Sequence, residues 1–169
     1  LQKYLLEKIN PETGMWGGYD SEDPDQCSRM VQFAYHLFAL FFYDHVQIPY
    51  PEKVVRHVLA TQNEFGGFGV KLNSSACEDI DSIYILTKLA PMVPNRNLEI
   101  DNALKKALLW VLCNQADDGG FVFRLEEPLV YGHPEMSSEK NQGAMFSTWF
   151  RTLTLTYLIR YFNWPPQLF

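Results

Sequence analysis

The chain has 169 residues and a net charge of −6, and 47% of its residues are hydrophobic and 15% aromatic. This composition supports a substantial core and argues against wholesale disorder. The acidic balance and the lack of any lysine- or arginine-rich run argue against a nucleic-acid partner and against an anionic membrane surface. No transmembrane segment is expected, because the longest apolar run, Val31 to Tyr43, is short and is interrupted by His36.

Hydrophobic periodicity predicts an all-α chain. In chain order the expected helices cover residues 1–9, 27 to about 45, 51–62, 77–89, 99–115 and 141 to about 162. The second, fourth and sixth are apolar nearly all round, which is typical of buried helices, whereas the third and fifth carry a single apolar stripe. A polar loop is expected at 126–140, and the tail after Asn163 is expected to be irregular.

The three cysteines, Cys27, Cys77 and Cys113, are odd in number and far apart. This usage is typical of a reducing compartment and predicts a cytoplasmic protein without a disulfide framework or a Cys-x-x-Cys metal site. The four histidines are at no recognisable ligand spacing. We therefore expect no metal and no cofactor.

A glycine–aromatic turn recurs three times in the sequence. Trp16, Phe68 and Phe121 each follow a glycine by two positions, at spacings of 52 and 53 residues, and each lies between an amphipathic helix and a more apolar one. A repeated supersecondary unit of this length is the mark of a helical array, in which stacked α-hairpins bury their inner helices. The alternative is three unrelated turns in an ordinary helical bundle.

The third turn, Gln115-Ala116-Asp117-Asp118-Gly119-Gly120-Phe121, matches the pattern Gln-x-x-(Asp/Glu)-Gly-x-(Trp/Phe) in full. With this motif the chain resembles the superfamily of terpenoid cyclases and protein prenyltransferases, over nearly its whole length. The copy at Gln62 has Phe65 at the acidic position, and the copy at Asn10 has Thr13 there.

The resemblance implies an α/α toroid. Three hairpins would supply half of one, so we expect residues 1–169 to form a single all-α, α/α-toroid-like arc of about three α-hairpins that is part of a longer protein. The alternatives are a half-toroid that pairs with a second chain, as in a homodimer or with a missing N-terminal half, and an open arc. An exposed edge would need a cover, because large apolar patches rarely face water.

The acidic cluster Glu78-Asp79-Ile80-Asp81-Ser82 opens the fourth helix. Crowded carboxylates beside an apolar cavity cannot all ionise cheaply, so one pKa should rise. The cluster resembles the Asp-x-Asp-Asp motif of class II cyclases, with Ser82 in place of the last aspartate. The resemblance implies that Asp81 is the acid and Asp79 its partner, with Glu78 beside them. The alternative is that these acids only cap the helix.

A carbocation formed by such an acid would need aromatic walls, because ring faces stabilise cations. Four aromatic residues on the inner helices are candidates for substrate binding: Phe33, Tyr84, Phe146 and Trp149. Arg151 is a further candidate, which could bind an anionic group or serve as a structural ion-pair partner.

Three functions fit these features. The first is a cyclase-like isomerase or lyase that acts on an isoprenoid or another apolar small molecule. The second is a non-catalytic module that binds a lipid or another helical domain on its concave face. The third is polysaccharide chemistry, for which the sequence offers no second acid at a persuasive position.

Overall fold

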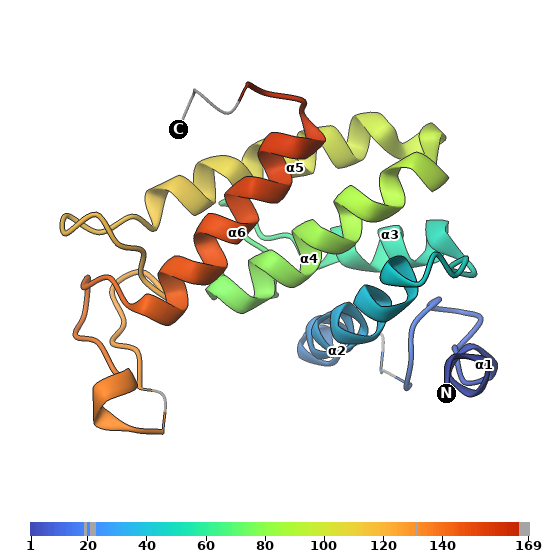
Figure 1. Cartoon of the computed structure of the whole chain (residues 1–169), viewed down its shortest axis with the longest axis horizontal. Helices are drawn as coiled ribbons and strands as arrows, with labels where there is room; N and C mark the ends of the chain where they lie inside the picture. The colour runs from blue at the N-terminus through green and yellow to red at the C-terminus, as the bar shows by residue number, and fades with distance from the viewer. Residues whose placement is uncertain (19, 21–22, 131, 166–169) are drawn as a thin grey trace.

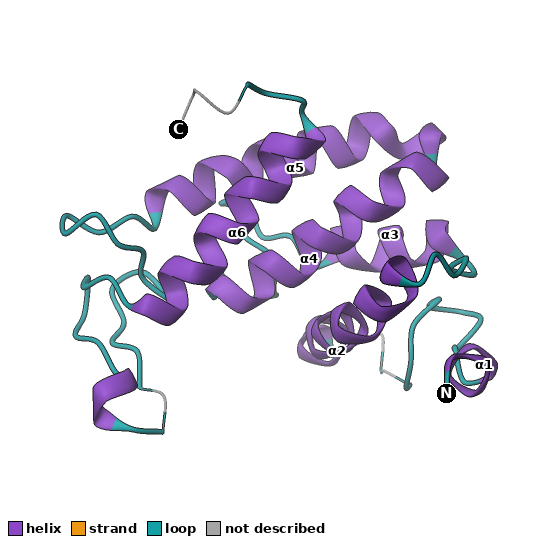
Figure 2. Cartoon of the chain, viewed as in Figure 1, coloured by secondary structure: helices purple, strands orange, loops and turns teal. Residues whose placement is uncertain are grey.

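Every regular element is helical in the computed structural model, which describes residues 1–18, 20, 23–130 and 132–165 (Figures 1 and 2). The all-α prediction is therefore confirmed. The helices are α1 (Gln2–Glu7), α2 (Pro24–Tyr43), α3 (Pro51–Ala60), α4 (Ala76–Leu89), α5 (Asn97–Cys113) and α6 (Met145–Tyr161). Short 3-10 turns cover Ala90–Met92, Pro94–Arg96 and Pro134–Met136.

Two helix starts differ from the prediction by three or more residues, because capping and backbone geometry override periodicity. Helix α2 begins three residues before the expected Cys27, since the Asp23 side chain accepts a hydrogen bond from the Gln26 amide and Pro24 fits the first helical position. Helix α6 begins at Met145 instead of Asn141. Asn141 has a φ of 59°, which is left-handed and incompatible with a helix.

Helix α4 is the centre of the fold. It packs against α2 on one side and α6 on the other, and also contacts α3 and α5 (Figure 1). The three most apolar helices of the sequence are thus neighbours. Their contacts form the core together with α3 and α5, and its buried members include Phe38, Phe41, Val55, Val58, Ile83, Leu86, Leu104 and Leu158.

The three glycine–aromatic turns share their local geometry. We refer to residues 10–18, 62–69 and 115–121 as turn 1, turn 2 and turn 3. Each has a glycine at positive φ two residues before its aromatic: Gly14 at 75°, Gly66 at 98° and Gly119 at 87°. The three aromatics, Trp16, Phe68 and Phe121, are all buried. Helices α3 and α5 are predicted to extend to Gln62 and Gln115. Each ends two residues earlier, because these glutamines already belong to the turns.

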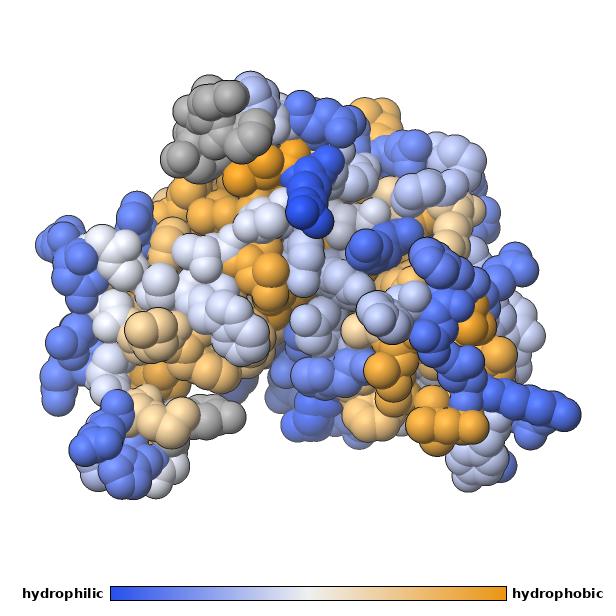
Figure 3. All heavy atoms as spheres, in the orientation of Figure 1, coloured by the Kyte–Doolittle hydropathy of each residue, from blue (hydrophilic) through white to orange (hydrophobic). Residues whose placement is uncertain are grey.

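In the described ranges no helix combines the length and apolarity needed to cross a bilayer. The three cysteines are free thiols: Cys27 is buried, Cys77 is half-buried and Cys113 is exposed. Apolar and polar residues alternate over the face shown in Figure 3, which is hollowed along its lower edge.

Candidate functional site

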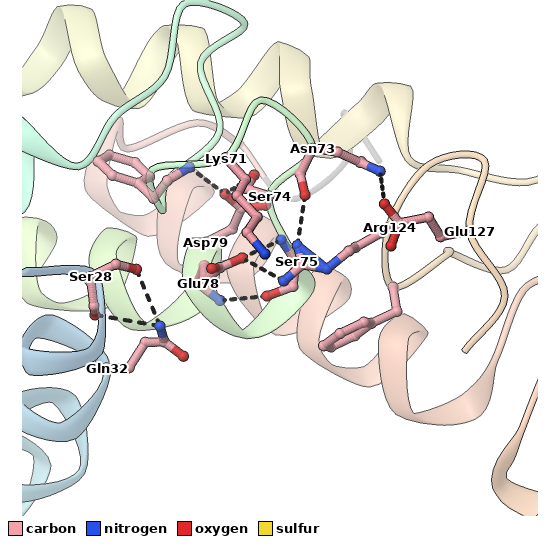
Figure 4. A network of polar contacts seen from close by, with 12 residues as sticks. Ser28, Gln32, Lys71, Asn73, Ser74, Ser75, Glu78, Asp79, Arg124 and Glu127 are labelled. Carbon is pink, nitrogen blue, oxygen red and sulfur yellow. Dashed lines mark hydrogen bonds and ion pairs between the residues drawn. The ribbon is translucent and has the colours of Figure 1, made fainter. Parts of the chain in front are cut away.

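The acidic cluster begins with a helix cap. The Ser75 hydroxyl accepts a hydrogen bond from the Glu78 amide at 3.3 Å, and the Glu78 carboxylate accepts one from the Ser75 amide at 2.7 Å (Figure 4). This reciprocal pair is a capping box. Glu78 also forms an ion pair with Arg124 at 3.1 Å. The contacts of Glu78 therefore fit the alternative that this residue caps the helix.

Asp79 is fully buried and surrounded by donors. Its carboxylate accepts hydrogen bonds from the Phe68 amide at 2.7 Å, the Ser74 hydroxyl at 3.0 Å and the Trp110 indole N–H at 3.0 Å, and it pairs with the Arg151 guanidinium. Burial raises the pKa of Asp79, and Arg151 together with the other donors opposes that rise. Because an ionised carboxylate only accepts, four donors fit its charged form. Asp79 thus joins turn 2 to α5 and α6.

Arg151 lies in the interior and completes this junction. Besides Asp79, its guanidinium donates to the Asn114 side-chain oxygen at 3.1 Å and to the carbonyl oxygens of Phe123 at 3.3 Å and Ser74 at 3.4 Å. Its side chain has no exposed surface. These contacts fit the structural ion-pair alternative for Arg151, since a buried guanidinium that is already engaged offers no face to a ligand.

Asp81 has the opposite environment, although it is only two positions from Asp79. The residue is 4% exposed, and its carboxyl makes no hydrogen bond or ion pair with any residue that the structure describes. Burial, together with the nearby charges of Glu78 and Asp79, raises the pKa of Asp81 to about 8. This shift favours the protonated form of Asp81 at neutral pH.

A cluster of tyrosines spans α2, α4 and α6, and its member Tyr84 is three positions after Asp81 on α4. The Tyr84 ring lies 5.2 Å from the Tyr35 ring of α2 and 5.0 Å from the Tyr157 ring of α6, measured between ring centroids. Burial raises the pKa of Tyr35 to about 12, and the charges of Tyr157 and Asp81 contribute to that rise. The sequence analysis selected Tyr84 and missed Tyr35 and Tyr157. Their signal was available, because both are polar-tipped aromatics inside strongly apolar helices.

Phe146 and Trp149 lie at a different place, where both line a cavity. Its volume is about 610 Å³, and it is formed by the start of α6 and the loop that precedes it. Its apolar lining consists of Met136, Ala144, Met145, Phe146 and Trp149. Neither Asp79 nor Asp81 lines it. Phe33 is also separate, 55% exposed on α2.

The structure thus separates the predicted site residues, with Glu78 in the helix cap and Phe33 exposed on α2. Asp79 and Arg151 form a buried junction, Asp81 and Tyr84 are three positions apart on α4, and Phe146 and Trp149 line the cavity at the start of α6. Among the described residues, no group of three or more histidine, cysteine or acidic side chains is placed to hold a metal ion.

Comparisons of the chain with protein-family models, with curated proteins and with solved structures found no match.

Proposed function

We propose that this chain is an α/α-hairpin domain of the terpenoid cyclase type, which starts the cyclisation of an isoprenoid or a similar apolar substrate by protonating it. In this proposal α2, α4 and α6 form the inner layer of an arc, and α1, α3 and α5 form its outer layer. The observation that carries the proposal is the buried carboxyl of Asp81, which has no hydrogen-bond partner among the described residues and is three positions before Tyr84 of the tyrosine cluster on α4.

Asp81 is suited to give a proton to a weak base such as an alkene. Its acid form is the stable one at neutral pH, and no hydrogen bond to a described residue holds that proton. The Asp81 O–H bond breaks as a new C–H bond forms at one alkene carbon, and the π electrons supply that bond. The neighbouring carbon becomes cationic and closes onto the next double bond. The cyclised cation then loses a proton to water and becomes a neutral product, and Asp81 takes up a proton from water.

The surroundings of Asp81 support both steps. Glu78 and Asp79 disfavour its ionised form, so they keep the proton in place before the reaction. The rings of Tyr35, Tyr84 and Tyr157 present π faces and edges on three helices, and π faces stabilise a positive charge. Asp79 is then a positioning residue, whose own charge is balanced by Arg151.

The Asp81→Asn variant tests this role. The purified chain would be incubated with linear isoprenoid alkenes, their epoxides and prenyl diphosphates, and the products would be separated by gas chromatography and mass spectrometry. Since asparagine has the shape of the neutral acid but cannot act as an acid, we expect cyclised product to fall by about 100-fold or more. Asp117→Asn, on the exposed part of turn 3, is the control and should react as the wild type does. Equal turnover in Asp81→Asn would remove the assignment.

A second function, non-catalytic binding of an apolar ligand, is favoured by the cavity at the start of α6. That cavity contains four large apolar side chains and neither of the two aspartates. If this is the function, an apolar fluorescent probe should bind without being converted. Trp149→Ala should then weaken its binding about 10-fold, and Asp81→Asn should leave it unchanged, a pattern opposite to that of the first proposal.

A further inference from the structure

The outer surface of α3 and turn 2 has a counterpart on α5 and turn 3, 53 residues later. Leu59, Gln62, Gly66 and Phe68 correspond to Leu112, Gln115, Gly119 and Phe121. Gln62 and Gly66 contact α5, whereas a Cβ added to Gly119 would meet no atom of the described chain. We refer to Leu112, Gln115 and Gly119 as the α5 edge.

Turn 2 lies directly on the backbone of α5. The Gln62 side-chain amide donates to the Ala103 carbonyl at 2.8 Å. A Cβ added to Gly66 would lie 2.6 Å from the Lys106 carbonyl oxygen, so the contact requires a glycine. Leu59 and Gln62 line the same narrow cleft as Ala103 and Lys106. A small residue on the helix and a glycine in the turn together allow this close approach.

Turn 1 is packed on α3 in the same manner. A Cβ on Gly14 would lie 3.0 Å from the Tyr50 carbonyl oxygen and 2.7 Å from a methyl of Val54. The helix also contributes basic groups, because Lys53 donates to the Pro11 carbonyl at 2.6 Å and lies 4.0 Å from the Glu12 carboxylate. Lys53 and Lys106 are themselves 53 residues apart, so both helices present a lysine at the same register.

The glycine of the α5 edge has a positive φ like those of turns 1 and 2, but no helix of the described chain packs on it. A Cβ on Gly119 would meet no atom of the described chain within 4 Å. Gln115 turns back to donate to the Gly119 carbonyl at 3.2 Å, the contact that Gln62 makes to Gly66 in addition to its bond to α5. Leu112 is 38% exposed and Leu109, one turn before it, is 65% exposed. This surface therefore offers a helix an unobstructed glycine turn, a glutamine side chain and two exposed leucines.

We propose that the α5 edge binds an amphipathic α-helix of a partner protein, which packs on turn 3 as α5 packs on turn 2. That helix should carry two small residues one turn apart, as α5 carries Ala103 and Ala107, with a lysine or arginine between them as Lys106 is. Asp117 is exposed on turn 3 and would face this basic residue. The chain's net charge of −6 favours a basic partner over a second copy. The proposal does not depend on the cyclase assignment.

A peptide with the sequence of residues 97–112, labelled with a fluorophore, is a suitable probe, because this helix already has the required pattern. We expect saturable binding to the full chain by fluorescence anisotropy. Leu112→Glu should weaken it at least 10-fold, whereas Leu98→Glu, at an exposed leucine of the same helix outside the α5 edge, should leave it within twofold. A peptide with both Ala103 and Ala107 replaced by leucine should bind at least 10-fold more weakly than the parent peptide.

Three results would overturn the proposal. The first is no saturable binding of the parent peptide. The second is equal binding by Leu112→Glu and Leu98→Glu, since the contact would then lie elsewhere. The third is concentration-dependent dimerisation of the chain alone that Leu112→Glu abolishes in sedimentation experiments, because the α5 edge would then bind a second copy. Circular dichroism of both variants verifies that their folds are intact.

Discussion

At the residue scale, Asp79 and Asp81 show how two carboxyls on one helix acquire different chemistry. Asp79 is surrounded by three hydrogen-bond donors and a guanidinium, whereas Asp81 is buried beside like charges. A buried ion pair is weak evidence of net stability, but breaking one side of it leaves an uncompensated charge. The pair therefore fixes how α4, α6 and turn 2 meet, and Asp81 is the group left free to titrate.

The titration of Asp81 should be visible in stability. Its pKa in the folded chain, about 8, is above its ordinary value of 3.8, so the folded state holds a proton that the unfolded state has lost. The free energy of unfolding should therefore fall as pH rises from about 4 to about 8, at up to about 1.4 kcal/mol per pH unit. The Asp81→Asn variant has no ionisable group at this position, so it lacks this pH dependence. Urea unfolding at pH 5 and pH 7 should show the variant gaining about 2–3 kcal/mol relative to the wild type.

A constant difference between Asp81→Asn and the wild type across this range would contradict the raised pKa. The comparison is made at fixed salt, because the nearby charges of Glu78 and Asp79 contribute to the shift.

At the element scale, the three turns decide how closely consecutive outer helices approach. Each needs a glycine for its positive φ, but only turns 1 and 2 also need one for space. Gly66 and Gly119 form a matched pair, since their φ values of 98° and 87° are similar and their surroundings differ.

Replacing each of these glycines with alanine separates the two effects. Gly119→Ala should cost about 1–2 kcal/mol, the strain of an alanine in the left-handed region. Gly66→Ala should cost about 1–3 kcal/mol more, because its methyl group would collide with the α5 backbone. Chemical denaturation of both variants measures the difference. Equal losses would mean that turn 2 can move away from α5 without penalty.

At the scale of the whole molecule, α4 connects the fold and α1 is peripheral to it. Helix α4 packs against four other helices, whereas α1 has no buried residue. Local opening free energies follow buried contacts, so the two helices should mark the extremes of protection.

Hydrogen exchange followed by mass spectrometry should find the slowest amides in α4 and the fastest helical amides in α1. Leu86→Ala removes a fully buried side chain and should lower the unfolding free energy by about 2–5 kcal/mol. Its effect should spread to the helices packed on α4. Leu109→Ala, at a largely exposed leucine, should change little. Faster exchange confined to α4 in Leu86→Ala would argue against its central role.

The sequence alone determined the elements. Helical periodicity and the recurrence of glycine before an aromatic are local properties, so the six helices and three turns could be predicted, with errors of up to a few residues at ends set by caps and by a left-handed asparagine. The acidic cluster and the inner aromatics could also be found, because their residue types are visible in the sequence.

Only the tertiary structure decided what each of these residues meets. Arg151 reaches Asp79 from 72 positions away, and Tyr35 and Tyr157 reach the Asp81 region from two other helices. Whether a carboxyl is charged depends on the water it loses and the donors it gains, and both are set when α2, α4 and α6 pack together. Local sequence therefore placed two aspartates on one helix, and long-range packing made one an ion-pair partner and favoured the protonated form of the other.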